Sequence, residues 1–251
     1  MINIKNDAEL DQMRAAGHVA ATIKNKMAKE CTPGVTTQEL DYYGRDLMKE
    51  MGAKSAFKGY KTYPGYTCIS VNDEVVHGIP GQRRIEFGDI VSIDVGVHYD
   101  GFVGDNATTV MVGVTDPEII RLVKTAEQSL AAGIEKAIVG CRLYDISHAI
   151  ESVVLEAGFT VVRDFVGHGV GRSMHEEPQI PNYGSPGKGP KLKRGMTFAI
   201  EPMVNLGTAD VEIMSDGWTV LTKDRKPSVH VEHTVAIMED KAEILTLGEN
   251  A

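Results

Sequence analysis

Two aspartates lie inside apolar stretches of the sequence, where a lone carboxylate is unfavourable. Asp94 lies within the apolar stretch 91–96, and Asp105 follows eleven residues later in a second such stretch. Burying an unpaired carboxylate costs on the order of several kcal/mol. A hairpin turn at 99–100 places the two aspartates opposite each other, and a turn at 100–101 makes them diagonal neighbours. In either register they share one face of the sheet, so they repel unless one is protonated or a cation lies between them.

Three further residues have similar placement. Glu201 and Glu232 lie on apolar, strand-like segments, and His168 is flanked by glycines that let the backbone approach another group closely. Each residue alone has an ordinary explanation, such as a strand end or an ion pair. Few Lys or Arg residues lie on the same segments to neutralise the acids, however. Four carboxylates and one imidazole fit two divalent ions, and Mn²⁺, Fe²⁺ or Co²⁺ suit them better than a thiolate-seeking metal does. Two metals that share one hydroxide form a nucleophile that attacks amides or phosphates.

Two helices are predicted before these strands. Asp7 is a candidate N-cap, followed by apolar residues at spacings of three and four until the sequence breaks at 31–34. Thr36 and Glu39 form a capping box for a second helix that stops at Gly52.

The same pattern returns in the second half of the chain. Asp116 precedes a proline at the first helical position, and Asp145 is a candidate N-cap for a helix that runs to Gly158. The caps at 7 and 36 recur at 116 and 145, an offset of 109 residues in both cases. A helix pair followed by strands, repeated at one offset, predicts two halves related by a pseudo-twofold axis, at about 7–112 and 116–238.

The remaining segments predict an antiparallel sheet. Most strand candidates alternate in polarity or are rich in β-branched residues, and they lie at 67–71, 89–97, 102–112, 159–163, 197–201, 210–214, 218–221 and 230–238. The stretch 178–190 contains four prolines and three glycines and is predicted to be an ordered loop. We expect an α+β fold in which helices face antiparallel sheet, with residues 1–251 forming one domain.

Composition excludes several classes of protein. The chain has 251 residues, a formal charge of −9 and no run of Lys or Arg, which argues against binding to nucleic acid or to an anionic membrane. The three cysteines form no Cys-x-x-Cys pair and indicate reduced thiols. No stretch approaches a membrane helix, and the first ten residues are acidic where a signal peptide is apolar. We therefore expect a cytoplasmic protein.

Longer motifs around the candidate ligands carry a resemblance over nearly the whole chain. The sequence resembles the methionine aminopeptidase family, whose fold is called pita bread, in the strings Asn72-Asp-Glu-Val-Val-His-Gly-Ile-Pro80, Ile93-Asp-Val-Gly96, Gly104-Asp105, Gly167-His-Gly-Val-Gly-Arg-Ser-Met-His-Glu-Glu-Pro178, Ile200-Glu-Pro-Met203 and Val231-Glu-His-Thr234. Between His168 and Glu201 there is no long insertion, so the resemblance is to the compact, bacterial-style type I enzymes.

The resemblance implies removal of the initiator methionine from new polypeptides when the second residue is small. It implies that Asp105 and Glu232 bridge two divalent ions, that Asp94 binds one ion, and that His168 and Glu201 bind the other. Mn, Fe or Co is favoured, and Zn is an alternative. The bridging hydroxide attacks the scissile amide, and Glu201 handles its proton.

The resemblance also implies roles for residues around the metals. His77 and His175 match two histidines that contact the scissile amide and stabilise the tetrahedral intermediate. The predicted methionine pocket comprises Tyr60, Tyr63, Cys68, His77 and Trp218, and His175 is a further predicted substrate-binding residue. Phe57 and Met174 depart from residues common in relatives, and both changes bear on pocket shape. A monovalent cation is implied near Asn72 and Ser228.

Two rival functions remain open on the sequence. An Xaa-Pro peptidase of the same fold needs a pocket that accepts proline after the scissile bond, and a non-catalytic binding module is expected to lose ligands or gain basic patches. This chain keeps all five ligand candidates and is acidic. Its expected partner is the N-terminal peptide of nascent proteins. Ribosome contact is compatible with that substrate, although no segment indicates it, and nothing in the sequence demands more than a monomer.

Overall fold

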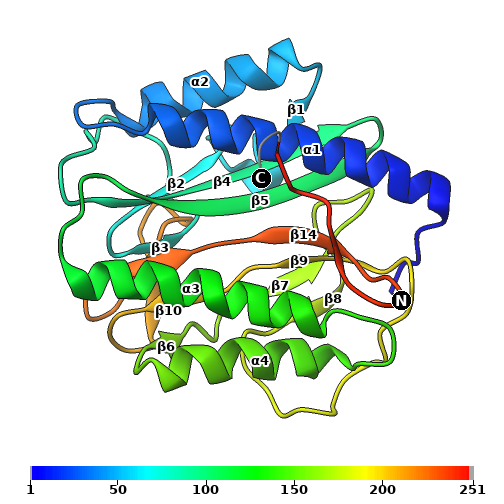
Figure 1. Cartoon of the computed structure of the whole chain (residues 1–251). Helices are drawn as coiled ribbons and strands as arrows, with labels where there is room; N and C mark the ends of the chain where they lie inside the picture. The colour runs from blue at the N-terminus through cyan, green and yellow to red at the C-terminus, as the bar shows by residue number, and fades with distance from the viewer. Residues whose placement is uncertain (1, 249–251) are drawn as a thin grey trace.

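Four long helices form the two outer faces of the molecule. The computed structural model describes residues 2–248. The helices are α1 (Asp7–Glu30), α2 (Thr37–Glu50), α3 (Pro117–Lys136) and α4 (Leu143–Glu156). Figure 1 shows α1 and α2 along one side of the strands and α3 and α4 along the other. This arrangement is the predicted one, in which paired helices face antiparallel sheet.

The helix starts follow the capping chemistry, with two corrections. Thr36 and Asp116 are N-caps as predicted. The first cap is Asn6 rather than Asp7, because the Asn6 side chain accepts from the Glu9 N–H while the Glu9 carboxylate accepts from the Asn6 N–H.

Asp145 is also displaced from its predicted role. It lies inside α4, and its carboxylate accepts from the N–H of Arg142, which is the N-cap. The observed caps at 6, 36, 116 and 142 therefore give offsets of 110 and 106 residues, so the prediction of a single offset of 109 is wrong, although the helix pair does recur.

The first half of the chain forms a four-stranded antiparallel sheet under α1 and α2. Its strands are β1 (Lys54–Ser55), β2 (Cys68–Val71), β4 (Ile90–Tyr99) and β5 (Phe102–Met111). β4 pairs with all three of the others. One hydrophobic core lies between this sheet and its helices, and it includes Ile23, Leu40 and Val95.

The second half repeats the scheme with a five-stranded sheet. Its strands are β7 (Gly167–Gly169), β8 (Glu176–Ile180), β9 (Thr197–Ile200), β14 (His233–Ala236) and β15 (Glu243–Ile244), in the order β15-β14-β9-β7-β8. A second core, including Leu122, Ile150 and Phe198, packs this sheet against α3 and α4.

Short strands complete the fold. They are β3 (Glu74–Val76), β6 (Thr160–Val161), β10 (Met203–Asn205), β11 (Val211–Ile213), β12 (Val220–Thr222) and β13 (Ser228–His230), in the sheets β13-β10-β6 and β11-β12-β3. The strand predicted at 230–238 is split into β13 and β14, and the predicted loop 178–190 begins as the last part of β8. None of the helices within residues 2–248 is long and apolar enough to span a membrane.

The two halves join along β5. The backbone of Ala107 on β5 exchanges hydrogen bonds with the backbone of Glu232, at 3.0 and 3.4 Å. Nearby, the Thr234 hydroxyl donates to the Asp105 carbonyl at 2.7 Å. This junction brings residues from opposite ends of the chain into one site.

Candidate metal centre and substrate pocket

The β4–β5 hairpin settles the register of the two aspartates. Tyr99 pairs with Phe102, so the turn lies at 100–101 and the aspartates are diagonal neighbours, the second of the two predicted registers. Both turn residues have positive φ, 47° and 80°, as a tight hairpin turn of this kind requires. Asp94 and Asp105 therefore share one face of the sheet.

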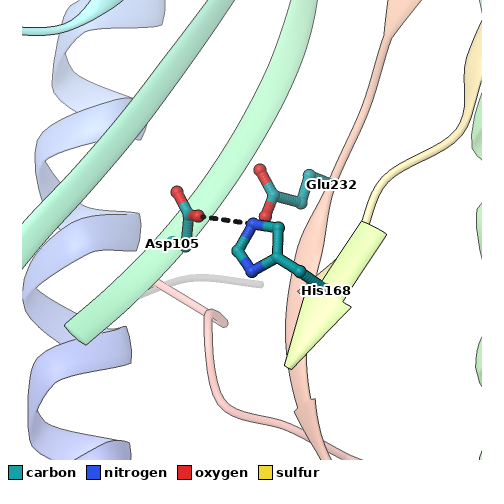
Figure 2. Close-up of side chains that lie close together, drawn as sticks. All are labelled: Asp105, His168 and Glu232. Atoms are coloured by element: carbon teal, nitrogen blue, oxygen red, sulfur yellow. Dashed lines mark ion pairs between the residues drawn. The ribbon is translucent and has the colours of Figure 1, made fainter. Parts of the chain in front are cut away.

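The second half contributes the other side of the site. The Ala107–Glu232 backbone pair places Glu232 beside Asp105. His168 lies on β7 and pairs with Ala199 of β9, the strand that ends one residue before Glu201. Nε2 of His168 is 3.7 Å from Oδ2 of Asp105 and 3.5 Å from Oε1 of Glu201. Ligand atoms of Asp105, His168 and Glu232 lie within 4.8 Å of one another, and Figure 2 shows the three side chains converging.

His168 is oriented for binding through Nε2. Its Nδ1 lies 2.9 Å from the carbonyl oxygen of Gly169. A carbonyl only accepts, so Nδ1 carries the proton and donates, which leaves the lone pair of Nε2 directed toward the acids.

The acids are arranged as ligands that need a cation. Oδ1 of Asp94, Oδ1 of Asp105 and Oε1 of Glu232 are buried and have no hydrogen-bond partner within residues 2–248. Burial raises the pKa of Asp94 to about 7. Burial, together with repulsion from neighbouring carboxylates, raises the pKa of Asp105 and of Glu232 well above their usual values. Bound divalent ions offset both the burial of the carboxylates and the repulsion between them. The four negative charges of the carboxylates balance two divalent ions, so the residues present fit a dinuclear centre.

Glu201 is electrostatically different from the other three acids. Burial raises its pKa, but contacts with His230, His168 and His77 outweigh burial and leave the pKa below its usual value. Nε2 of the buried His230 lies 3.4 Å from Oε2 of Glu201. Glu201 is thus an ionised carboxylate with two imidazoles beside it, as a proton-accepting group requires.

All the predicted site residues line one cavity of about 390 Å³. Its wall combines the five ligand candidates with the predicted pocket residues Tyr60, Tyr63, Cys68, His77, His175 and Trp218. Trp218 meets the rings of Tyr63 and His77 edge-on, at centroid distances of 5.1 and 6.0 Å. The polar ligands therefore adjoin an aromatic compartment that contains one thiol.

The side chains of Phe57 and Met174 pack together against Gly96 of strand β4. A Cβ at Gly96 would lie 2.8 Å from atoms of each side chain, so only glycine leaves room for both. Phe57 also meets Tyr63 edge-on at 6.4 Å. Both side chains line the cavity, so these two departures from the residues common in relatives shape its wall.

Two histidines flank the ligands without joining them. His77 has a φ of 59°, a costly conformation for a residue other than glycine, and burial lowers its pKa to about 4. His175 stacks on Tyr60 at 5.3 Å and contacts His168 at 4.3 Å; desolvation by these surroundings, with repulsion from His168, lowers its pKa to about 4. Both imidazoles are neutral at pH 7, so each can either donate or accept a hydrogen bond.

Asn72 and Ser228, the residues implied for a monovalent cation, lie beside each other and are not among the residues that line the cavity. The Ser228 N–H donates to the Asn72 carbonyl at 2.9 Å, and the Ser228 hydroxyl donates to Oδ1 of Asn205 at 2.7 Å. These contacts have a structural role of their own, and the monovalent cation stays a prediction.

Sequence reasoning missed several members of the site, among them Phe165 and His230. Phe165 lines the cavity and meets His77 edge-on at 5.6 Å. His230 contacts Glu201, and its signal was available, because it lies two residues before Glu232 in an extended segment.

Comparisons with known proteins agree with this geometry. The sequence model of metallopeptidase family M24 matches residues 11–239. A methionine aminopeptidase from Clostridium acetobutylicum is 48% identical over 250 residues, covering 99% of this chain and all of that protein.

Solved structures support the same relationship. The crystal structure of a methionine aminopeptidase from Thermotoga maritima superposes with a TM-score of 0.96 at 46% identity, covering 98% of this chain and 99% of the other. A prolidase from Pyrococcus furiosus superposes with a TM-score of 0.81 at 26% identity, over 98% of this chain and 66% of its own. These matches confirm the pita-bread fold. The chain belongs to metallopeptidase family M24 and, within it, to the methionine aminopeptidases.

Proposed function

We propose that this enzyme removes the N-terminal methionine from newly made polypeptides whose second residue is small. The observation that carries the proposal is the junction of five ligand candidates with an aromatic, sulfur-containing compartment in one cavity. This junction supports a site in which metal-dependent hydrolysis and recognition of methionine occur in the same cavity. We propose that the enzyme works in the cytoplasm and that it is a monomer.

Two divalent ions fit among the acids. Asp94, Asp105, His168, Glu201 and Glu232 would hold them, because these side chains line one cavity where the two halves of the chain join. When bound, such a pair supplies Lewis acidity and lowers the pKa of water to near neutral. Mn²⁺, Fe²⁺ and Co²⁺ are the favoured ions, with Zn²⁺ as an alternative.

The side chains around the ions divide the remaining work. Glu201 takes a proton from the attacking water and delivers it to the leaving amine, a role that suits an ionised carboxylate between two imidazoles. The neutral imidazoles of His77 and His175 hydrogen-bond to the scissile amide and stabilise negative charge on its oxygen. Both lie on the cavity wall beside the ligands.

The aromatic compartment supplies selectivity for methionine. Tyr63, Trp218 and Cys68 present edges, faces and a thiol to a flexible thioether, a combination that sulfur contacts favour. At the rim, Tyr60 stacks on His175, and we infer that this pair limits the size of the second residue.

The first experiment is hydrolysis of Met-Ala-Ser by metal-stripped protein, with Mn²⁺, Fe²⁺, Co²⁺, Zn²⁺ or nothing added back. Release of methionine should require metal and should greatly exceed release of leucine from Leu-Ala-Ser. Met-Leu-Ser tests the limit on the second residue, and an Ala-Pro peptide tests the Xaa-Pro alternative. No release from folded protein with any metal would overturn the proposal in favour of a binding module.

A further inference from the structure

Glu176, the residue after His175, forms an ion pair with the N-terminal segment of the chain. Glu176 is partly buried, and its Oε2 accepts from Nζ of Lys5 at 2.7 Å and from Nδ2 of Asn3 at 2.9 Å. The Lys5 and Glu176 side chains are only 5% and 8% exposed. An ion pair therefore links residues 171 positions apart, directly beside a predicted catalytic histidine.

The second oxygen of Glu176 closes the loop that carries His175. Oε1 accepts from the backbone N–H of Arg172 at 2.9 Å and of Ser173 at 3.4 Å. A Cβ on Gly171 would lie 2.5 Å from Oε1 and 2.6 Å from Nζ of Lys5, so a side chain at this position would have to displace the ion pair. Four donors thus hold one carboxylate, and the loop 171–176 has little freedom while they are in place.

The N-terminal segment is itself anchored. The N–H of Lys5 donates to the Gly195 carbonyl at 2.7 Å, and the next residue, Asn6, caps α1. A more exposed pair, Arg172 with Glu9 at 3.2 Å, makes a second tie between the same two segments. Exposed pairs contribute little, so the buried pair is the stronger constraint.

Stability alone does not account for such a pair. A buried ion pair is often no more stabilising than apolar residues of the same volume, whereas it fixes the geometry of its partners. Neither Lys5 nor Glu176 lines the substrate cavity, while Met174 and His175 of the same loop do. The loop 171–176 therefore gives the pair a direct route to the cavity wall.

We propose that Lys5 and Glu176 are positioning residues that hold His175 against the scissile amide. The inference rests on the proposed role of His175. A displacement of about 1 Å in a catalytic group can cost about 100-fold in rate. Loss of the pair should therefore appear mainly in kcat and leave metal binding unchanged.

The test compares Lys5→Met, which keeps the aliphatic volume, and Glu176→Gln with wild type. With Met-Ala-Ser and saturating Mn²⁺, each should lower kcat by about 10- to 100-fold. Lys5→Arg should restore most of the activity. Arg14→Met is the matched control, because it breaks an N-terminal ion pair with Glu243 that lies outside the cavity, and kcat should not change.

Combined variants separate positioning from general destabilisation. In a His175→Ala background, Lys5→Met should lower kcat by a further factor of less than about three. In a His77→Ala background, Lys5→Met should lower kcat by the same factor as it does in wild type. Equal effects in both backgrounds, or unchanged kcat in both single variants, would overturn the proposal.

Hydrogen exchange provides a readout that does not depend on activity. Lys5→Met should accelerate exchange of the Arg172 and Ser173 amides, and Arg14→Met should not. If wild type released no methionine, the proposed function would fail while exchange still decided whether the pair orders the loop. Unchanged exchange at these amides would overturn the positioning role whatever the activity.

Discussion

Nε2 of His230 lies 3.4 Å from one carboxylate oxygen of Glu201, while Nε2 of His168 lies 3.5 Å from the other. The Glu201 carboxylate is therefore bracketed by two imidazoles, and its plane is set by both. His168 is a proposed ligand, whereas His230 is 2% exposed and is not among the residues that line the cavity. We infer that His230 orients Glu201 for metal binding and proton transfer.

Replacement of His230 tests this relationship. His230→Leu removes the ring nitrogen beside Glu201 and should weaken Mn²⁺ binding by about 10- to 100-fold. His230→Gln can place a side-chain N–H beside Glu201 and should retain most of the affinity. Calorimetric titration of metal-stripped protein measures both, and equal affinities for the two variants would contradict the assigned role.

Asp105→Asn tests the dinuclear site. Loss of a shared ligand should lower kcat/KM for Met-Ala-Ser by more than about 100-fold, because removal of even an outer partner of a ligand costs that much. Bound metal, measured by atomic emission, should fall in parallel. The control is Asp240→Asn at an exposed position, which should match wild type. Full activity in Asp105→Asn would exclude the proposed ligand assignment.

Stability of the metal-free protein should depend on pH in a defined direction. Burial raises the pKa of Asp94 from 3.8 to about 7, so the folded state holds a proton that the unfolded state loses above about pH 4. The raised pKa values of Asp105 and Glu232 act in the same direction. These acids therefore lower the stability of the metal-free protein as pH rises from about 4 to 7, while the lowered pKa values of His77 and His175 raise it between about pH 4 and 6.5, so the contribution of the acids is measured against Asp94→Asn.

Metal should reverse that loss, because it binds the ionised acids of the folded state. Mn²⁺ at 100 times its Kd should add about 2.7 kcal/mol to the free energy of unfolding. Thermal melts with chelator or Mn²⁺ at pH 5, 6 and 7 measure both effects. Asp94→Asn removes one of the acids, so the acids should contribute less to the pH dependence of its metal-free melting temperature. If the melting temperature of metal-free wild type fell no more steeply with pH, relative to Asp94→Asn, the raised pKa assigned to Asp94 would be contradicted.

The ligand candidates could be predicted because their residue types conflict with their local environment. An acid on an apolar strand, such as Asp94 or Glu232, has no local explanation, so the conflict itself indicates a cation. The β4–β5 register was reduced to two choices, and both placed Asp94 and Asp105 on one face. Period-2 alternation decides that question without knowledge of the rest of the fold.

Other features depend on contacts that sequence periodicity does not contain. Arg142 caps α4 because the Asp145 carboxylate reaches back to its N–H, and that geometry moves the helix start by three residues. β7 is only three residues long and two of them are glycine, so it exists through pairing with its neighbours. The pair of Lys5 and Glu176 joins segments whose proximity follows only from the finished fold.

Gly104 lies where α1 contacts β5, and its replacement tests that packing. A Cβ at this position would lie 2.3 Å from the carbonyl oxygen of Ala16. Gly104→Ala must push α1 away and should cost about 1–3 kcal/mol of stability. At Gly81, the nearest atom to a Cβ is 4.0 Å away, so Gly81→Ala is the control. Urea unfolding should separate the two variants, and equal midpoints would contradict the close approach.

Trp218 tests whether the aromatic compartment recognises methionine. Its ring lies edge-on to Tyr63 and His77 and lines the cavity, so Trp218→Ala removes one wall of the pocket. Loss of an apolar wall of this kind is worth about 1–3 kcal/mol, so KM for Met-Ala-Ser should rise about 10- to 100-fold. The preference for Met-Ala-Ser over Leu-Ala-Ser should narrow, since a wider pocket no longer distinguishes a thioether from a branched chain.

Trp218→Phe should keep most of the preference, and Phe87→Ala, at a position 80% exposed and outside the cavity, should change neither KM nor the preference. If Trp218→Ala left both KM and the preference unchanged, Trp218 would have a packing role only, and methionine selectivity would have to come from Tyr63 and Cys68.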